Sequence, residues 1–107
     1  MIAIGPVEGF RRRALTACHA DGVTLVVILT QDGLKVIENR CPHQQTDRLH
    51  EGTIDANGLT CPLHGRTFDL SDGTCRNGDG RLTFLATDVR DGVLWVSLPE
   101  APTYSNF

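Results

Sequence analysis

The residues that decide how this chain folds read C-P-H at 41–43 and C-P-L-H-G at 61–65, with seventeen residues between His43 and Cys61. Each motif brings one thiol and one imidazole close together. The prolines at 42 and 62 restrict the backbone beside each cysteine, and Gly65 permits a tight bend. The two motifs together offer four metal ligands, Cys41, His43, Cys61 and His64.

Two thiolates and two imidazoles suit two kinds of metal centre. In one, the thiolates hold one iron of a [2Fe-2S] cluster and the imidazoles hold the other, which raises the reduction potential above that of an all-cysteine cluster. In the other, the four ligands surround one zinc ion tetrahedrally. The spacing of the motifs and the glycine that follows the second favour the iron-sulfur cluster, so we expect one-electron transfer. The colour of the protein separates the two, because a zinc protein is colourless.

The size and composition predict a single ordinary domain. A length of 107 residues corresponds to one domain over residues 1–107, and so small a domain gains stability from a metal cross-link. The formal net charge of -3 leaves no basic excess to attract nucleic acid. The longest apolar run, Val23–Leu29, is far shorter than the roughly 20 residues of a membrane-spanning helix. The N-terminus has no secretory-signal pattern, so we expect a cytoplasmic protein without membrane association.

The cysteines have two possible uses. Their even count, 4, would suggest two disulfides in a secreted chain. Because no signal sequence is expected, metal ligation explains Cys41 and Cys61 better, and Cys18 and Cys75 are spare thiols. Cys18 and His19 are adjacent on a predicted strand and should point to opposite faces, which argues against a chelate. We expect Cys75 to pack beneath the metal-binding loops.

Repeated turn dipeptides indicate the fold class. Asp-Gly occurs at 21–22, 32–33, 72–73, 79–80 and 91–92, and Asn-Gly at 57–58 and 77–78, and these pairs tolerate the positive φ angles of tight hairpin turns. The segments between them predict strands at Arg12–Cys18, Val23–Thr30, Leu34–Glu38, Leu82–Val89 and Val93–Leu98, with a shorter strand at Leu59-Thr60. No window keeps a helical period over ten residues, so we expect an all-β domain, a small antiparallel sandwich or barrel. Residues 99–107, with two prolines, should be irregular.

Three further features have ordinary structural explanations. His50 could face a partner near the ligand histidines, but we expect a solvated side chain. Arg11–Arg13 could steer an acidic partner, but we favour an exposed edge strand, where charge opposes aggregation. Trp95 lies in an alternating strand and should pack in or against the core.

Residues 41–68 resemble the C-x-H-x17-C-x2-H motif of Rieske proteins, and the whole chain matches one Rieske domain in length. The resemblance implies one [2Fe-2S] cluster held by Cys41, His43, Cys61 and His64. It also implies an all-β Rieske-like fold with an inserted cluster-binding subdomain of two loops. The likeness is closer still to Rieske-type ferredoxins, the ferredoxin components of bacterial multicomponent aromatic-ring dioxygenases.

Some positions depart from the high-potential members of that group. Respiratory-complex Rieske proteins have a disulfide across the two loops, where this chain has Thr46 and Leu63. They also place a serine and a tyrosine where this chain has Arg66 and Phe68. Fewer hydroxyl donors stabilise the reduced cluster less, so we expect a potential near the low end of the Rieske range, about -150 mV. Residues 76–82, R-N-G-D-G-R-L, lack the proline common in the family's cluster-covering loop, so we expect looser cover there.

The resemblance implies an electron carrier rather than an enzyme. We expect a monomer that docks transiently, taking electrons from a flavin-dependent, NAD(P)H-oxidising ferredoxin reductase and passing them to a terminal oxygenase. A Rieske oxygenase also needs a 2-His-1-carboxylate iron site, and only His19 and His50 remain for one. Two alternatives stay open: the Rieske small subunit of a reductase such as assimilatory nitrite reductase, and a structural or regulatory module that uses the cluster as a redox or stability element.

Overall fold

The structure, a computed structural model, describes residues 1–39, 49–62, 65–78 and 80–98, and strands dominate them. The strands are β1 (Ile2–Pro6), β2 (Leu15–Ala20), β3 (Val23–Thr30), β4 (Gly33–Glu38), β5 (Thr53–Asp55), β6 (Gly58–Thr60), β7 (Thr67–Phe68), β8 (Phe84–Leu85), β9 (Thr87–Arg90) and β10 (Val93–Val96). Two short helices, α1 (Val7–Phe10) and the 3-10 turn η1 (Leu49–Glu51), complete the described part. Neither has the length to cross a bilayer. The predicted all-β class is confirmed.

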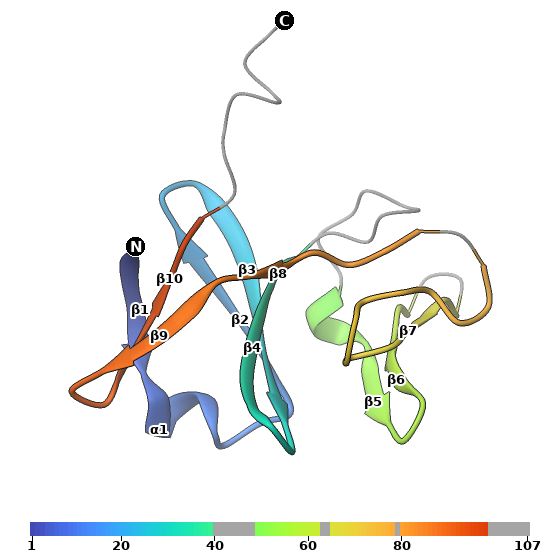
Figure 1. Cartoon of the computed structure of the whole chain (residues 1–107), viewed down its shortest axis with the longest axis horizontal. Helices are drawn as coiled ribbons and strands as arrows, with labels where there is room; N and C mark the ends of the chain where they lie inside the picture. Colours follow the sequence, from blue (N-terminus) through green and yellow to red (C-terminus); the bar gives the residue numbers. More distant parts are fainter. Residues whose placement is uncertain (40–48, 63–64, 79, 99–107) are drawn as a thin grey trace, which may run out of the picture.

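The strands form three antiparallel sheets, in the orders β1-β10-β9, β2-β3-β4-β8 and β5-β6-β7. β4 and β8 pair directly, with Val36 opposite Leu85 and Ile37 opposite Phe84. The whole β5-β6-β7 sheet therefore lies within the connection between two neighbouring strands of the larger sheet. Figure 1 shows this inserted unit to one side of the other two sheets. The expected insertion is confirmed.

Two Asp-Gly turns have the backbone that their sequence predicts. Asp21 and Gly22 have φ angles of 49° and 78°, and they join β2 to β3. Asp91 and Gly92 have φ angles of 52° and 76°, and they join β9 to β10. Two successive positive φ angles are the mark of a type I′ turn, whose twist matches that of the strands it connects.

The central strand β3 is buried on both faces and separates two apolar cores. The core next to the inserted unit, here called the insertion core, contains Val26, Ile28, Ile37, Leu49, Leu59, Cys61, Phe68 and Leu82. The core on the other face, here called the sheet core, contains Phe10, Leu25, Val27, Val36, Leu94 and Val96. Successive side chains of a strand point to opposite faces. Consecutive apolar residues in β3 therefore supply both cores, which explains the continuous run V-T-L-V-V-I-L.

Two strand predictions need correction. The predicted strand Arg12–Cys18 begins only at Leu15, because α1 ends at Phe10 and the chain then turns to reach β2. Arg11–Arg13 lie exposed in that turn, so their interpretation as an edge strand is wrong. The predicted strand Leu82–Val89 is two strands, because β8 pairs with β4 in one sheet and β9 pairs with β10 in another.

The remaining comparisons of prediction with structure each concern one strand, one residue or the tail. The prediction at Val23–Thr30 agrees with β3 at both ends. β1 was not predicted, and it pairs with β10 through a bulge between Ala3 and Gly5. Trp95 is half-buried, and the Arg90 guanidinium carbon lies 5.1 Å from its ring centroid. The expected irregular tail, residues 99–107, lies outside the described residues.

Candidate metal centre

One of the four predicted ligands, Cys61, belongs to the part of the chain that the structure describes; Cys41, His43 and His64 lie outside it. Cys61 directly follows β6, is 1% exposed, and belongs to the insertion core. The second motif therefore begins at the end of a strand, as predicted, and presents one thiol on the apolar side of the inserted unit.

The second ligand loop, residues 61–66, is closed by its own backbone. The N–H of Cys61 donates to the carbonyl of Arg66 at 2.8 Å, and the N–H of Gly65 donates to the carbonyl of Cys61 at 3.1 Å. Gly65 has a φ of 69°, the left-handed conformation for which a glycine was expected at this bend. Beyond the loop, Thr60 on β6 pairs with Thr67 on β7, and their hydroxyl oxygens lie 2.8 Å apart. Backbone hydrogen bonds thus hold Cys61, where the loop begins, against Gly65 and Arg66, where it ends.

The first motif lies between two residues that bind one another. Asn39, which is 2% exposed, follows β4, and His50 lies in η1. The Asn39 amide nitrogen lies 2.8 Å from His50 Nδ1, and the His50 N–H donates to the Asn39 amide oxygen at 3.2 Å. The two ends of the segment that contains Cys41 and His43 are therefore held together. His50 is half-buried in this contact, so its interpretation as a solvated side chain is wrong.

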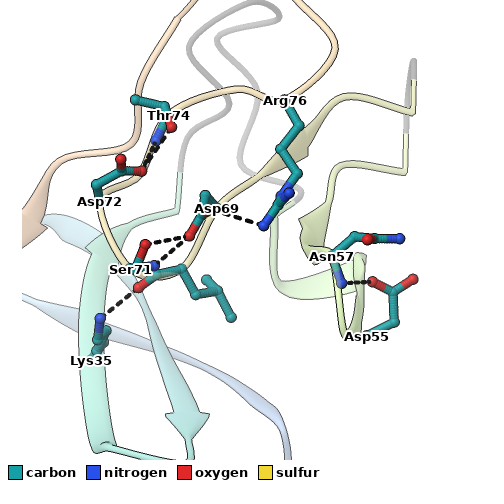
Figure 2. Close-up of polar contacts among 9 residues, drawn as sticks. Lys35, Asp55, Asn57, Asp69, Ser71, Asp72, Thr74 and Arg76 are labelled. Carbon is teal, nitrogen blue, oxygen red and sulfur yellow. Dashed lines mark hydrogen bonds and ion pairs between the residues drawn. The ribbon is translucent and has the colours of Figure 1, made fainter.

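A lysine joins the inserted unit to the large sheet. Lys35 on β4 donates from Nζ to the carbonyl of Leu70 in the turn after β7, as Figure 2 shows. The same ammonium nitrogen lies 4.8 Å from the ring centroid of Phe84 on β8. A charged donor and an aromatic face thus fix this turn against β4 and β8.

Two carboxylates order the turn that Lys35 contacts. Asp69 accepts from the N–H and the hydroxyl of Ser71 at 2.8 and 2.6 Å and pairs with Arg76 at 2.8 Å. The hydrogen bonds from Ser71, and then the charge of Arg76, lower the pKa of Asp69. Asp72 accepts from the N–H and the hydroxyl of Thr74, and these bonds lower its pKa too. Figure 2 shows the two carboxylates on one turn of the inserted unit.

The remaining cysteines both pack against apolar cores, as was predicted for Cys75. Cys18 is half-buried against the sheet core, and burial raises the pKa of its thiol. His19 is exposed, and its Nδ1 lies 3.1 Å from the Thr24 hydroxyl oxygen, so the two neighbours do point apart. Cys75 packs against the insertion core and forms a β-bridge with Phe68.

A family model for the Rieske [2Fe-2S] domain matches residues 1–86 of this chain. The chain belongs to this family. One [2Fe-2S] cluster is accordingly its cofactor. The described residues fit that group, because a buried thiol begins a loop whose ends are hydrogen-bonded to one another, and Asn39 and His50 hold together the two ends of the segment that contains the other motif. Since only Cys61 of the four predicted ligands is described, the described residues alone contain no group of three metal-binding side chains.

Relatives and solved structures agree with this assignment. A Rieske 2Fe-2S iron-sulfur protein of Mycolicibacterium smegmatis is 40% identical over 52 residues, which cover 49% of this chain and 10% of that protein. The match therefore spans about a tenth of the length of this curated relative. The ferredoxin of Sphingomonas yanoikuyae B1 superposes with a TM-score of 0.78 at 21% identity, over 92% of this chain and 98% of that chain.

Two further solved structures share the fold. A chain from the complex of reduced oxygenase and oxidized ferredoxin in carbazole 1,9a-dioxygenase gives a TM-score of 0.75 at 21% identity, covering 90% of this chain and 100% of that chain. A protein described as the small subunit of NADH-dependent nitrite reductase from Mycobacterium tuberculosis gives 0.77 at 15% identity, covering 94% of this chain and 96% of that chain. At these identities, the similarity establishes the fold.

The sequence did not reveal the residues that hold the ligand segments in place. Lys35, Asn39 and Asn77 each bond to atoms distant in sequence or across a loop, and no local pattern marks them. The one available signal was position, since Asn39 lies two residues before Cys41.

Proposed function

We propose that this chain is a low-potential Rieske ferredoxin that carries single electrons from a NAD(P)H-dependent flavin reductase to a terminal oxygenase. We take residues 1–107 as one cytoplasmic domain, with Cys41, His43, Cys61 and His64 as the cluster ligands. Membership of the Rieske family, together with a complete four-ligand motif in the sequence, is the observation that carries the proposal.

The cysteine and histidine ligands have different proposed roles, which follow from their chemistry. When bound, the cluster accepts and releases one electron without making or breaking a substrate bond. The thiolates of Cys41 and Cys61 would hold one iron, and Cys61 would do so from within the insertion core, where its neighbours are apolar. The imidazoles of His43 and His64 would hold the other iron, and we assign to them the path by which an electron would reach a docked partner.

The histidines that are not proposed ligands support the role of an electron carrier rather than that of an oxygenase. Besides the proposed ligands, the chain has only His19 and His50. His19 lies on β2 beside Thr24, and His50 binds Asn39, so these two are separate in the described structure and each has another contact. A 2-His-1-carboxylate oxygenase site would need both histidines at one iron. The fold shared with a ferredoxin and with a chain of an oxygenase–ferredoxin complex supports the choice of partner.

A second candidate function is that of a Rieske small subunit of a nitrite reductase. The structural similarity to the Mycobacterium tuberculosis protein is the observation that favours it. Tight association distinguishes the two roles, since a subunit co-purifies with a large catalytic partner and a diffusible carrier does not. Affinity purification of the tagged chain from its native cells, followed by identification of stoichiometric partners, separates the candidates.

A reconstituted electron-transfer chain tests the proposal. The anaerobically purified holoprotein is mixed with NADH, a flavin-dependent ferredoxin reductase of a bacterial dioxygenase system, and cytochrome c as the final acceptor. We expect cytochrome c reduction to rise with the concentration of this chain and to saturate, while the His64→Ala variant supports none. If the reductase leaves the holoprotein oxidised, or if cytochrome c is reduced equally without this chain, the carrier role is wrong.

A further inference from the structure

Asn77 forms hydrogen bonds with three consecutive residues of the inserted unit, Gly65, Arg66 and Thr67. Its amide nitrogen donates to the carbonyl of Gly65 at 2.9 Å, and its amide oxygen accepts from the N–H of Thr67 at 3.0 Å. Its backbone carbonyl accepts from Arg66 Nη1 at 3.0 Å. The end of the second ligand loop is therefore tied to a residue that lies ten or more positions away in sequence.

These contacts fix the peptide that directly follows the proposed ligand His64. The Gly65 N–H is bonded to the carbonyl of Cys61, and the Gly65 carbonyl is bonded to Asn77. Gly65 is also the covalent neighbour of His64. Because both polar groups of Gly65 have assigned partners, the backbone that leads out of His64 is held by Cys61 on one side and by Asn77 on the other.

An amide is the side chain that this position requires. Asparagine carries a donor and an acceptor on one short planar group, whereas an aspartate would keep the acceptor and lose the donor, and a leucine would lose both. The surrounding segment, R-N-G-D-G-R-L at 76–82, has no proline to restrict its backbone. The Arg76 N–H donates to the carbonyl of Thr67 at 2.7 Å, and the side-chain hydrogen bonds of Asn77 add to this backbone contact.

Gly78 extends the same contact. A Cβ placed on Gly78 would overlap Arg66 Nη1, so the guanidinium occupies the space that any other residue at 78 would fill. Asn77 and Gly78 thus meet the ligand loop at its backbone and at Arg66 respectively. Replacing either one tests a different half of the same contact.

We propose that Asn77 is a positioning residue for the [2Fe-2S] cluster, holding the second ligand loop in the geometry that sets the reduction potential and retention of the cluster. This inference rests on the proposed assignment of Cys61 and His64 as ligands. Partners outside the first ligand sphere typically contribute about 10–100-fold to metal affinity or activity when they orient ligands. Asn77 acts in this way through Gly65 and Thr67.

The test compares Asn77→Leu and Asn77→Asp with matched changes at Asn57. Asn57 lies exposed in the β5–β6 turn of the same inserted unit, where its backbone N–H, not its side chain, donates to Asp55 (Figure 2). We expect Asn77→Leu to shift the reduced paramagnetic spectrum and the midpoint potential and to accelerate cluster loss about tenfold. Asn77→Asp should fall between, since it keeps the acceptor for Thr67, while Asn57→Leu and Asn57→Asp should match the wild type.

Other measurements distinguish a failure of the Asn77 inference from a failure of the proposed electron-carrier function. Aspartate also adds a negative charge, which by itself lowers the potential, so the neutral leucine variant reports the lost hydrogen bonds. Gly78→Ala keeps the Asn77 side chain and displaces Arg66, and it should alter the spectrum less than Asn77→Leu does. Wild-type spectra, potential and cluster retention in both Asn77 variants would overturn the inference while leaving the electron-carrier role intact. A wild-type protein that binds a cluster but transfers no electrons would overturn only the proposed function.

Discussion

Removing the Phe68 side chain should weaken both the fold and the retention of the cluster. Phe68 is fully buried on β7 and belongs to the same apolar core as Cys61. A buried phenylalanine covers about 150–250 Å², and at about 25 cal/mol per Å² that burial corresponds to roughly 4–6 kcal/mol. Alanine retains a small part of the side chain, so Phe68→Ala should lower the free energy of unfolding by about 3–5 kcal/mol. That loss is a large share of the roughly 5–15 kcal/mol that stabilises a typical domain.

Denaturation and cluster loss measure the two effects separately. With a slope of about 3 kcal/mol per M in guanidinium chloride, a loss of about 4 kcal/mol lowers the unfolding midpoint by about 1.3 M. Circular dichroism follows this transition under anaerobic conditions. The decay of visible absorbance without denaturant follows the cluster, and we expect it to be faster in Phe68→Ala because the cavity opens beside the Cys61 loop.

Leu94→Ala is the matched control. Leu94 is buried to the same degree in the sheet core, on the other face of β3. Its replacement should lower stability by about 2–5 kcal/mol but leave the decay of visible absorbance close to that of the wild type. A stability loss below about 1 kcal/mol in Phe68→Ala, or equal cluster loss in the two variants, would refute a supporting role of the insertion core.

Three other predictions concern single side chains. His64→Ala should abolish the normal visible and paramagnetic spectra while His19→Ala keeps them, and an unchanged His64→Ala spectrum would refute the ligand assignment. Lys35→Met should lower the free energy of unfolding by about 2 kcal/mol, because a charged donor to the Leu70 carbonyl is lost; a denaturation midpoint equal to wild type would contradict this. Hydrogen bonds lower the pKa of Asp69 below its ordinary 3.8, so its stabilisation is present above that value and is lost as the pH falls through the lowered pKa. Asp69→Asn should therefore reduce the loss of stability in acid, and an identical acid profile would argue against it.

Local patterns predicted the parts of the fold that local physics decides. β3 was placed correctly because a run of β-branched residues between two turns leaves few alternatives. The Asp21-Gly22 and Asp91-Gly92 turns were predicted because positive φ angles favour these residue types. By contrast, β1 owes its strand to β10 at the far end of the chain, and no window around Ile2–Pro6 contains that information.

The break between β8 and β9 shows the same limit. Leu82–Val89 looks like one continuous strand in sequence, but Phe84–Leu85 pair with β4 and Thr87–Arg90 pair with β10. The chain changes sheets at Ala86, and that change depends on where the two sheets lie. The alternation of apolar residues within this segment contains no information about that change of sheet.

The sequence predicts four ligands for the candidate site, and that ligand set stays a prediction, since of the four only Cys61 lies in the described part of the chain. Cysteine and histidine in two spaced motifs predict a metal centre because thiolate and imidazole are the ligands of a Rieske cluster. The supporting contacts at Asn39 and Asn77 depend on which backbone groups the fold brings near each amide. His50 shows the consequence, since a polar residue between two motifs was expected in solvent and instead binds a buried asparagine.

The central claim is that this chain holds one [2Fe-2S] cluster with two sulfur and two nitrogen ligands. Iron and acid-labile sulfide analysis of anaerobically purified protein, combined with the paramagnetic spectrum of the reduced form, tests it most directly. We predict two irons and two sulfides per chain and a reduced spectrum typical of mixed histidine and cysteine ligation. Stoichiometric zinc without iron or sulfide, or a spectrum typical of four cysteine ligands, would contradict it.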